Sequence, residues 1–171
     1  GVCQHIEGNA YPLGEPDGSR SERVTALSKA MIAAGLRAPV RTGIRDEIWI
    51  KLWGNLCFNP ISALTHATLQ QMGSDPAVRA LIVLLMQEGQ AVGEALGARF
   101  KVPLERRLQG ATDVGAHKTS MLQDLERGRP MEIDALVTAV AELGDIVGVE
   151  TPMLDAVLAL VKLRAKVASL G

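Results

Sequence analysis

Helix start and stop signals recur along this chain from Ser19 to its end, and they restrict it to a largely helical fold. The clearest is Gly73-Ser74-Asp75-Pro76, where a capping residue precedes a proline that suits a first helical turn. The pattern that follows runs to about Leu96. It is the longest and most apolar helical segment, and we expect it to be the central helix. Aromatic residues are scarce (two Trp, two Phe and one Tyr), so aliphatic side chains must build the core, which favours an all-α fold.

Periodicity and capping residues predict six further helices. They are expected over residues 19–34, 46–64, 103–109, 120–127, 132–147 and 152–168. Pro60 is expected to interrupt the second of these, because proline cannot donate a hydrogen bond to the carbonyl of Leu56. Gly89, Gly93 and Gly97 recur every four residues and predict a close crossing between two helices.

The first 18 residues differ from the rest. Residues 2–6 alternate loosely, residues 7–9 resemble a turn, and Gly14-Glu15-Pro16-Asp17-Gly18 ends the segment, a pattern typical of one or two short strands closed by turns. Two lone strands are not stable in water and need a sheet to join, which the rest of this chain does not offer. We therefore predict two parts, a strand and turn segment at 1–18 and a helical domain at 19–171.

Composition excludes several classes of function. The formal net charge of -1 argues against nucleic-acid binding, and the longest apolar run, residues 80–86, is too short to span a membrane. Cys3 and Cys57 are far apart and have no nearby ligand at metal spacing, so neither a metal site nor a disulfide is predicted. A protein of the reducing cytoplasm is the expectation.

The most informative polar residues are Lys51, Asn55 and Asn59, which are spaced four apart. On a helix they fall on one stripe, and because Asn is a poor helix former, two of them on that stripe need an explanation. A lysine beside two amides supplies a proton donor next to groups that orient a carbonyl or carboxylate. The alternative is a solvated helix face, and spacing alone favours that alternative.

A second polar stretch contains Ser120 and Glu132. Ser120 is expected at a helix N-terminus, where its hydroxyl and the free backbone N–H groups can bind an anion, and Glu132 at the start of the next helix. Each is also a common capping or first-turn residue, and taken singly that structural role is favoured. Ser62 and His66 form only a weak nucleophile pair, without the sharp turn that presents a catalytic serine.

Both stretches resemble the ketopantoate reductase family. In that family the catalytic lysine is followed by two Asn at four-residue steps, and the second Asn is followed by Pro. In this chain the first pattern is Ile48-Trp49-Ile50-Lys51-Leu52, Asn55 and Asn59-Pro60. The second pattern is Ser120-Met121, Asp124, Gly128-Arg129 and Glu132-Ile133-Asp134, and the turn Gly148-Val149-Glu150-Thr151-Pro152 follows. The resemblance covers nearly the whole chain.

The resemblance implies a multi-helix C-terminal domain of the 6-phosphogluconate-dehydrogenase-like type. Residues 1–18 would be the β remnant of an N-terminal Rossmann domain whose main body is absent, so the chain alone is expected to be inactive. The implied cofactor is NADP, held mainly by that domain. Predicted partners are a small 2-keto-acid substrate, the Rossmann domain and a second copy of the chain.

The resemblance also assigns roles to five residues. Lys51 would be the general acid that protonates the alkoxide formed as hydride reaches the keto carbon. Asn55 and Asn59 would hydrogen-bond the substrate, and Ser120 would bind its carboxylate. Glu132 would contact the substrate hydroxyl or the nicotinamide and help to set the charge state of the lysine.

One departure leaves the substrate open. Some members carry a further substrate-binding Asn about ten residues after the second, where this chain has Thr68-Leu69-Gln70. The favoured reaction is 2-dehydropantoate to pantoate, and the alternative function is a non-catalytic helical interaction or dimerisation module. The enzymatic hypothesis predicts that four side chains converge on one cleft: Lys51, Asn55, Ser120 and Glu132.

Overall fold

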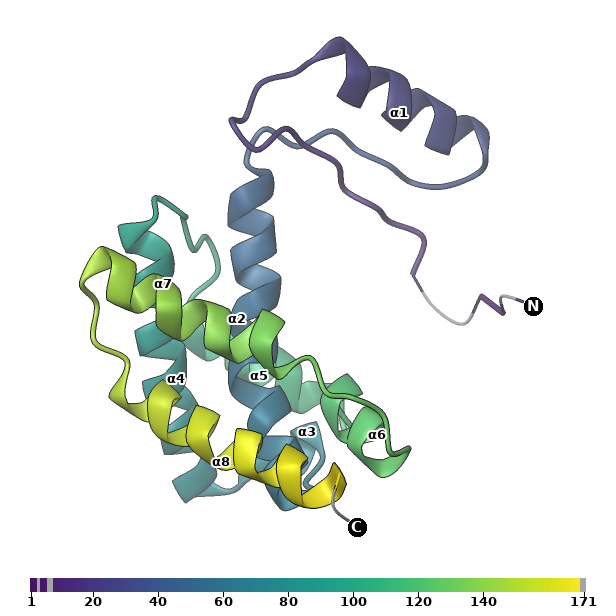
Figure 1. Cartoon of the computed structure of the whole chain (residues 1–171). Coiled ribbons are helices and arrows are strands. Elements are labelled where there is room, and N and C mark those ends of the chain that lie inside the picture. The colour runs from purple at the N-terminus through teal and green to yellow at the C-terminus, as the bar shows by residue number, and fades with distance from the viewer. Residues whose placement is uncertain (3, 6–7, 170–171) are drawn as a thin grey trace. The chain divides into compact units, whose positions relative to one another are not determined.

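The structure is a computed structural model that describes residues 1–2, 4–5 and 8–169 (Figure 1). The chain divides into two compact units, Gly1–Ile48 and Trp49–Gly171. The expected strand over residues 2–6 and the turn over 7–9 include Cys3, Ile6 and Glu7, which lie outside the described residues. The helical elements in chain order are α1 (Glu22–Ala33), α2 (Ile44–Thr65), α3 (Leu69–Ser74), α4 (Pro76–Ala95), α5 (Leu104–Asp113), α6 (Ser120–Glu126), the π-helix η1 (Asp134–Thr138), α7 (Ala139–Val147) and α8 (Pro152–Ser169).

The first unit contains α1, which begins and ends where local signals predict. The Ser21 side chain accepts a hydrogen bond from the backbone N–H of Val24 at the first turn. At the other end Gly35 has a φ of 87°, and the N–H groups of Gly35 and Leu36 donate back to the last turn, an arrangement that satisfies its free carbonyls. The sequence prediction for this helix is confirmed.

Residues 9–13 pair with the loop that follows α1. The N–H of Tyr11 donates to the carbonyl of Arg37 at 2.7 Å, and the N–H of Leu13 donates to that of Pro39 at 3.0 Å. Within the described residues these contacts give two isolated parallel bridges and no longer strand, so the predicted strands shorten to single bridges. The same hydrogen bonds place residues 8–18 in one compact unit with α1, and that unit extends to Ile48. A domain boundary at residue 18 stays a prediction.

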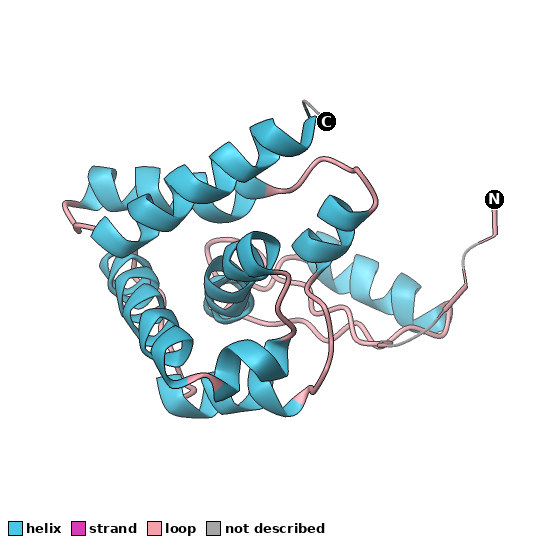
Figure 2. Cartoon of the chain, turned by 90° about the horizontal axis from the view of Figure 1, so that it is seen from below, coloured by secondary structure: helices cyan, strands magenta, loops and turns pink. Residues whose placement is uncertain are grey.

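The second unit is built around α2, whose residues 56–63 are all buried (Figure 2). Eight successive residues cover every side of a helix, so this part of α2 lies inside the domain although it includes the polar residues Asn59 and Ser62. Our expectation that α4 is the central helix is therefore wrong, since α4 leaves Leu84 46% exposed. Pro60 does not interrupt α2 either, because the residues on both sides of it are packed in the core and that packing offsets one lost hydrogen bond.

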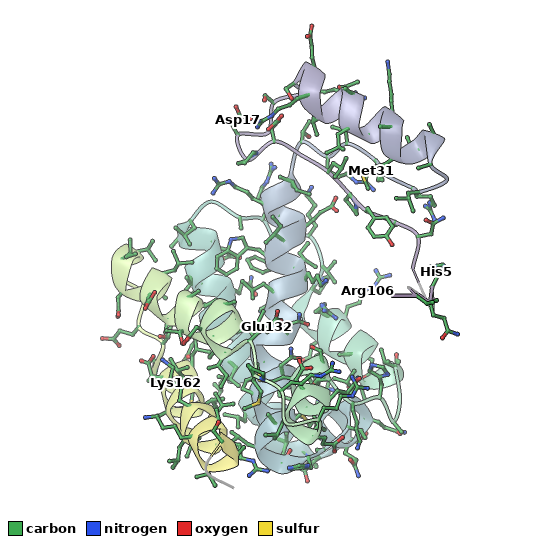
Figure 3. The ribbon with its side chains drawn as sticks, turned by 45° about the vertical axis from the view of Figure 1, so that its right-hand side comes forward. His5, Asp17, Met31, Arg106, Glu132 and Lys162 are labelled. Atoms are coloured by element: carbon green, nitrogen blue, oxygen red, sulfur yellow. The ribbon has the colours of Figure 1, made fainter. Side chains whose placement is uncertain are left out.

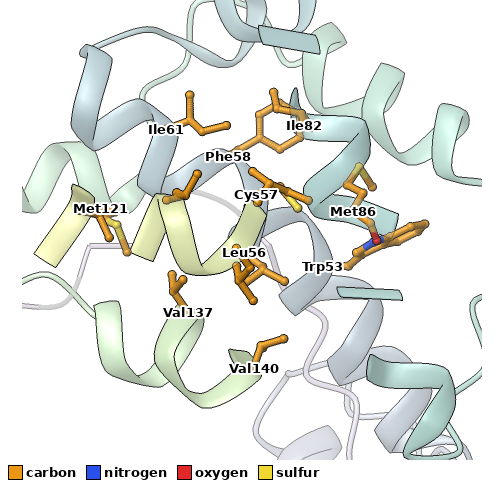
Figure 4. Close-up of a cluster of buried hydrophobic side chains, with 14 of the residues drawn as sticks. Trp53, Leu56, Cys57, Phe58, Ile61, Ile82, Met86, Met121, Val137 and Val140 are labelled. Atoms are coloured by element: carbon orange, nitrogen blue, oxygen red, sulfur yellow. The ribbon is translucent and has the colours of Figure 1, made fainter. Parts of the chain in front are cut away.

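Helices α2 and α4 cross closely, as the glycine spacing predicts. A Cβ at Gly89 would lie 2.7 Å from Cδ2 of Leu56, and one at Gly93 would lie 3.0 Å from Cε3 of Trp49. The Trp53 indole donates to the backbone carbonyl of Met86 at 2.6 Å, which ties the two helices together inside the aliphatic core (Figure 4). No helix in the described part of the chain is both long and apolar enough to cross a membrane.

Two helices of this unit begin at polar caps. The Asp75 carboxylate accepts hydrogen bonds from the N–H groups of Ala77 and Val78, which starts α4 immediately after α3. The Thr119 hydroxyl accepts from the N–H of Leu122 and starts α6. The helix predicted from about residue 132 begins instead as a π-helix at Asp134 and continues as α7.

Candidate functional site

The polar stripe of α2 leads from solvent into the core. Lys51 is exposed, Asn55 is half-buried one turn later, and Asn59 is only 4% exposed two turns later. The helix is continuous across all three residues, so they share one face. A solvated helix face does not explain this gradient, because a purely surface stripe would not end in a buried amide.

Asn59 carries a buried hydrogen-bond donor with no partner. Its Nδ2 atom is inaccessible to solvent and makes no hydrogen bond in the described part of the chain. Leaving such a donor unpaired costs about 1–3 kcal/mol, and most buried polar groups in native proteins are paired. The chain therefore retains, at this point of α2, a polar group that does not stabilise its fold.

A buried hydroxyl pair joins α2 to the start of α6. Ser62 Oγ donates to the carbonyl of Asn59 at 2.8 Å and is in hydrogen-bond contact with Oγ1 of Thr119. Because the single Ser62 proton is used on the carbonyl, the Thr119 hydroxyl donates to Ser62 Oγ. Both side chains are buried, at 0% and 6% exposure. The pair thus connects the backbone of Asn59 to the residue that caps the helix beginning at Ser120.

Ser62 is accordingly a structural residue and not half of a nucleophile pair. The His66 ring lies instead near charged groups, 3.7 Å from Glu126 and 3.1 Å from a guanidinium nitrogen of Arg164. In the described residues no group of three or more His, Cys, Asp or Glu side chains is placed to hold a metal ion.

Ser120 begins α6, and Glu132 lies in the connection between α6 and η1. Ser120 is the exposed first residue of α6. Because α6 has only seven residues, the dipole at its N-terminus is weak, and the Ser120 hydroxyl is the group that could bind a ligand. Glu132 is exposed on the stretch before η1 (Figure 3). The π-helix that follows is a rare element that is frequent at functional sites.

The structure does not bring all five predicted residues into contact. In the described part of the chain the side chains of Lys51 and Glu132 make no hydrogen bond or ion pair with any residue. Convergence of Lys51, Asn55, Ser120 and Glu132 on one cleft stays a prediction. What the structure does join is the Asn59 turn of α2 with the N-terminus of α6.

Sequence reasoning missed Arg107 of α5. Its Nε donates to the carbonyl of Ile50 at 3.4 Å, and a Cβ at Gly54 would overlap its guanidinium group. A half-buried cation therefore packs on α2 between the turns that carry Lys51 and Asn55. The available signal was Gly54 itself, since a glycine inside a helix lowers its stability unless another group needs the space.

Comparison with known proteins decides the family. A sequence model described as "Ketopantoate reductase PanE/ApbA C terminal" matches residues 43–165. The chain belongs to the ketopantoate reductase family. It is 63% identical over 162 residues to the 2-dehydropantoate 2-reductase of Mesorhizobium japonicum, covering 95% of this chain and 50% of that protein.

More distant members agree. The 2-dehydropantoate 2-reductase of Archaeoglobus fulgidus is 30% identical, with 91% of this chain and 52% of that protein covered. The crystal structure of 2-dehydropantoate 2-reductase from Methylococcus capsulatus matches with a TM-score of 0.83 at 32% identity, covering 94% of this chain and 53% of that one. The chain thus spans about half the length of these ketopantoate reductase relatives. The family model that it matches describes the C-terminal part of such proteins.

Proposed function

We propose that this chain is the substrate-side domain of an NADPH-dependent 2-keto-acid reductase that converts 2-dehydropantoate to pantoate. The observation that carries the proposal is the α2 stripe, in which an exposed lysine leads to a buried, unpaired amide in a member of the ketopantoate reductase family. A fold that needed only a helix at this position would favour an apolar residue in place of Asn59.

Lys51 acts as the general acid in this proposal. Its exposed ammonium group has no partner in the described residues, so its proton is free to be donated to an oxygen of the substrate. The proton reaches the keto oxygen as negative charge develops there, which lowers the barrier for reduction. Because Lys51 lies on the first turn of the stripe, the substrate would extend along α2 toward Asn59.

The two amides and Ser120 would orient the substrate. Asn59 Nδ2 makes no hydrogen bond in the described residues, so it would donate to a substrate oxygen without breaking a hydrogen bond of the fold once a movement of the surrounding side chains uncovers it. The exposed Ser120 hydroxyl would bind the carboxylate, and the Ser62–Thr119 pair would hold the first turn of α6 against α2. Fixed donors of this kind cost little reorganisation when the substrate binds.

The nicotinamide cofactor would be contacted here by Glu132. The reduced nicotinamide supplies the hydride that reaches the keto carbon. Glu132 fits a role beside it, because its exposed carboxylate has no internal partner in the described residues and follows a turn directly before a π-helix. The sequence contains no GxGxxG motif after a strand, so the nucleotide itself would be held by a domain outside this chain. A cytoplasmic location is part of the same proposal.

A second copy of the chain is the partner that α8 favours. Leu160, Leu163 and Val167 form a stripe that is more than half exposed. In an antiparallel pair of α8 helices, Leu160 would face Leu163 of the second copy. The same antiparallel pairing places the N-terminus of each α8 near the C-terminus of the other, which is favourable for the helix dipoles.

The test is a chimera in which the N-terminal half of the Mesorhizobium japonicum relative precedes this chain. NADPH oxidation with 2-dehydropantoate and with other branched 2-keto acids reports activity and substrate preference. Lys51→Met is expected to reduce kcat by about a hundredfold or more, the contribution of general acid catalysis. The matched control is Lys29→Met, which removes another exposed lysine and should leave kcat unchanged.

Two outcomes would overturn the proposal. One is a folded chimera that binds NADPH and reduces no 2-keto acid. The other is equal kcat in the Lys51 and Lys29 variants, which would remove the role of general acid from Lys51 and favour a non-catalytic helical module.

A further inference from the structure

A cavity of about 500 Å³ lies in the second unit and includes none of the five predicted site residues. Its walls come from the turn after α6, the start of η1 and the last turns of α8. Its volume is within the range of small-molecule sites, roughly 300–1,000 Å³. Its lining includes three cations and three apolar side chains: Arg129, Lys162, Lys166, Met131, Ile133 and Ala165.

The charges around this cavity are unbalanced. Lys162 Nζ lies 3.6 Å from Oδ1 of Asp134, the only carboxylate among the described residues that line the cavity. Arg129 and Lys166 make no ion pair or hydrogen bond with any described side chain. Three cations therefore share one anion around a concave surface, where charges are screened less than on a flat one. The arrangement favours an anionic ligand.

Apolar groups line the same space. Met131 and Ala165 are half-buried and Ile133 is 7% exposed, so the inner wall offers a place for a short hydrocarbon body. A free inorganic anion would use only the cations. A ligand with an anionic head and a compact apolar body would use both parts of the cavity.

The cavity shares a wall with the stretch that carries Glu132. Met131 and Ile133 line it on either side of Glu132, and Asp134 lines it at the first residue of the π-helix. Glu132 itself is exposed and is not among the lining residues. A ligand that packs against Met131 and Ile133 therefore restrains the backbone of the residue between them.

We propose that this cavity binds a small organic anion with an apolar body, and that its occupancy fixes the position of Glu132. The binding part stands on the cavity alone. The regulatory part rests on the proposed function, in which Glu132 contacts the substrate or nicotinamide.

Isothermal titration calorimetry of this 171-residue chain tests the binding part. Hexyl phosphate is the full probe, inorganic phosphate supplies charge alone, and hexanol supplies the apolar body alone. Hexyl phosphate should bind at least about tenfold more tightly than either, since a tenfold difference requires only ~1.4 kcal/mol. Hexanoate distinguishes a carboxylate from a phosphate head.

Charge-matched variants locate the site. The double variant Arg129→Gln/Lys166→Gln should weaken hexyl phosphate binding by about tenfold or more, as expected when two charge-assisted contacts are lost. The control Lys29→Gln/Arg106→Gln removes two exposed cations elsewhere and should leave the affinity within about twofold. Equal weakening in both double variants, or equal affinity for hexyl phosphate and inorganic phosphate, would reduce the effect to non-specific attraction and overturn the proposal.

The amide signals of residues 128–134 in two-dimensional NMR test the coupling. Saturating hexyl phosphate should shift the Glu132 amide in the parent chain and not in the Arg129→Gln/Lys166→Gln variant. Binding of hexyl phosphate without a shift of the Glu132 amide would refute the effect of the ligand on Glu132 and would leave the binding site supported. Because neither measurement depends on turnover, failure here is distinct from failure of the reductase proposal. Circular dichroism checks that each variant is folded. If the double variant does not fold, the single variant Arg129→Gln is measured in its place.

Discussion

Replacing Asn59 by alanine should make the chain more stable and the enzyme less active. The variant removes the buried Nδ2 donor that has no partner in the fold. If the role of that donor is to bind the substrate, it lowers the stability of the fold, and Asn59→Ala removes this destabilisation. Most substitutions at a 4% exposed position lower stability, so an increase would be a distinctive result.

Three terms set the expected size. Relief of the unpaired donor contributes about 1–3 kcal/mol. The higher helix propensity of alanine adds about 0.5 kcal/mol. The missing side-chain atoms leave a cavity of roughly 30 Å³, which costs about 0.7 kcal/mol at ~24 cal/mol per Å³. The net expectation is a gain of about 1–3 kcal/mol in the free energy of unfolding, or a rise in Tm of at least about 2 °C for a chain of this size.

Urea unfolding of the 171-residue chain measures the gain, with Asn55→Ala as the matched control. Asn55 lies one turn earlier on the same stripe and is half-buried, so its replacement should add only the propensity term of about 0.5 kcal/mol. In the chimeric reductase, Asn59→Ala should lower kcat/KM by about tenfold to a hundredfold. A loss of stability larger than about 1 kcal/mol would show that the amide has a structural partner, and an unchanged kcat/KM would remove it from the substrate site.

Three further outcomes follow from particular contacts. Both Glu88 carboxylate oxygens accept hydrogen bonds from backbone N–H groups at the start of α8, at 2.9 and 2.8 Å. Glu88→Gln should therefore reduce the free energy of unfolding by about 1–2 kcal/mol. An unchanged urea midpoint would contradict this. Hydrogen bonds from Arg23 and Ser21 lower the pKa of Glu15 from 4.5 to about 2. Because the pKa of Glu15 is lower in the folded chain, its ionised carboxylate stabilises the fold above pH 4.5, and this stabilisation is lost as the pH falls toward 2. Glu15→Gln should therefore reduce the loss of helicity between pH 4.5 and 2. Identical acid titrations of the variant and the parent chain would refute the pairing of Glu15 with Arg23 and Ser21. Leu163→Glu should convert a dimer to a monomer in size-exclusion chromatography with light scattering, and a parent chain that is monomeric at every concentration would exclude the α8 pairing.

Local sequence determined where most helices begin and end. Ser21, Asp75 and Thr119 each cap a helix through their own side chain, and such caps act over three residues, so they can be identified without the fold. The four-residue spacing of Lys51 and the two Asn likewise placed them on one stripe, because helix geometry alone sets that relation. Family resemblance, and not spacing, gave these residues their predicted roles.

Tertiary packing decided what these elements do together. Pro60 stays inside α2, and α2 instead of α4 becomes the buried helix, because neighbours from several other elements cover its residues 56–63. The contact between Ser62 and Thr119 joins residues 57 apart in sequence, a relation that no local pattern encodes. That Asn59 keeps an unpaired amide could not be predicted either, since satisfaction of a buried group depends on every atom around it. The sequence therefore determined most of the helices and the polar stripe by itself, although it indicated neither α3 nor the π-helical start at Asp134. Only the tertiary structure decided which end of that stripe is buried and to which helix it is joined, because burial and long-range hydrogen bonds exist only once the chain has packed.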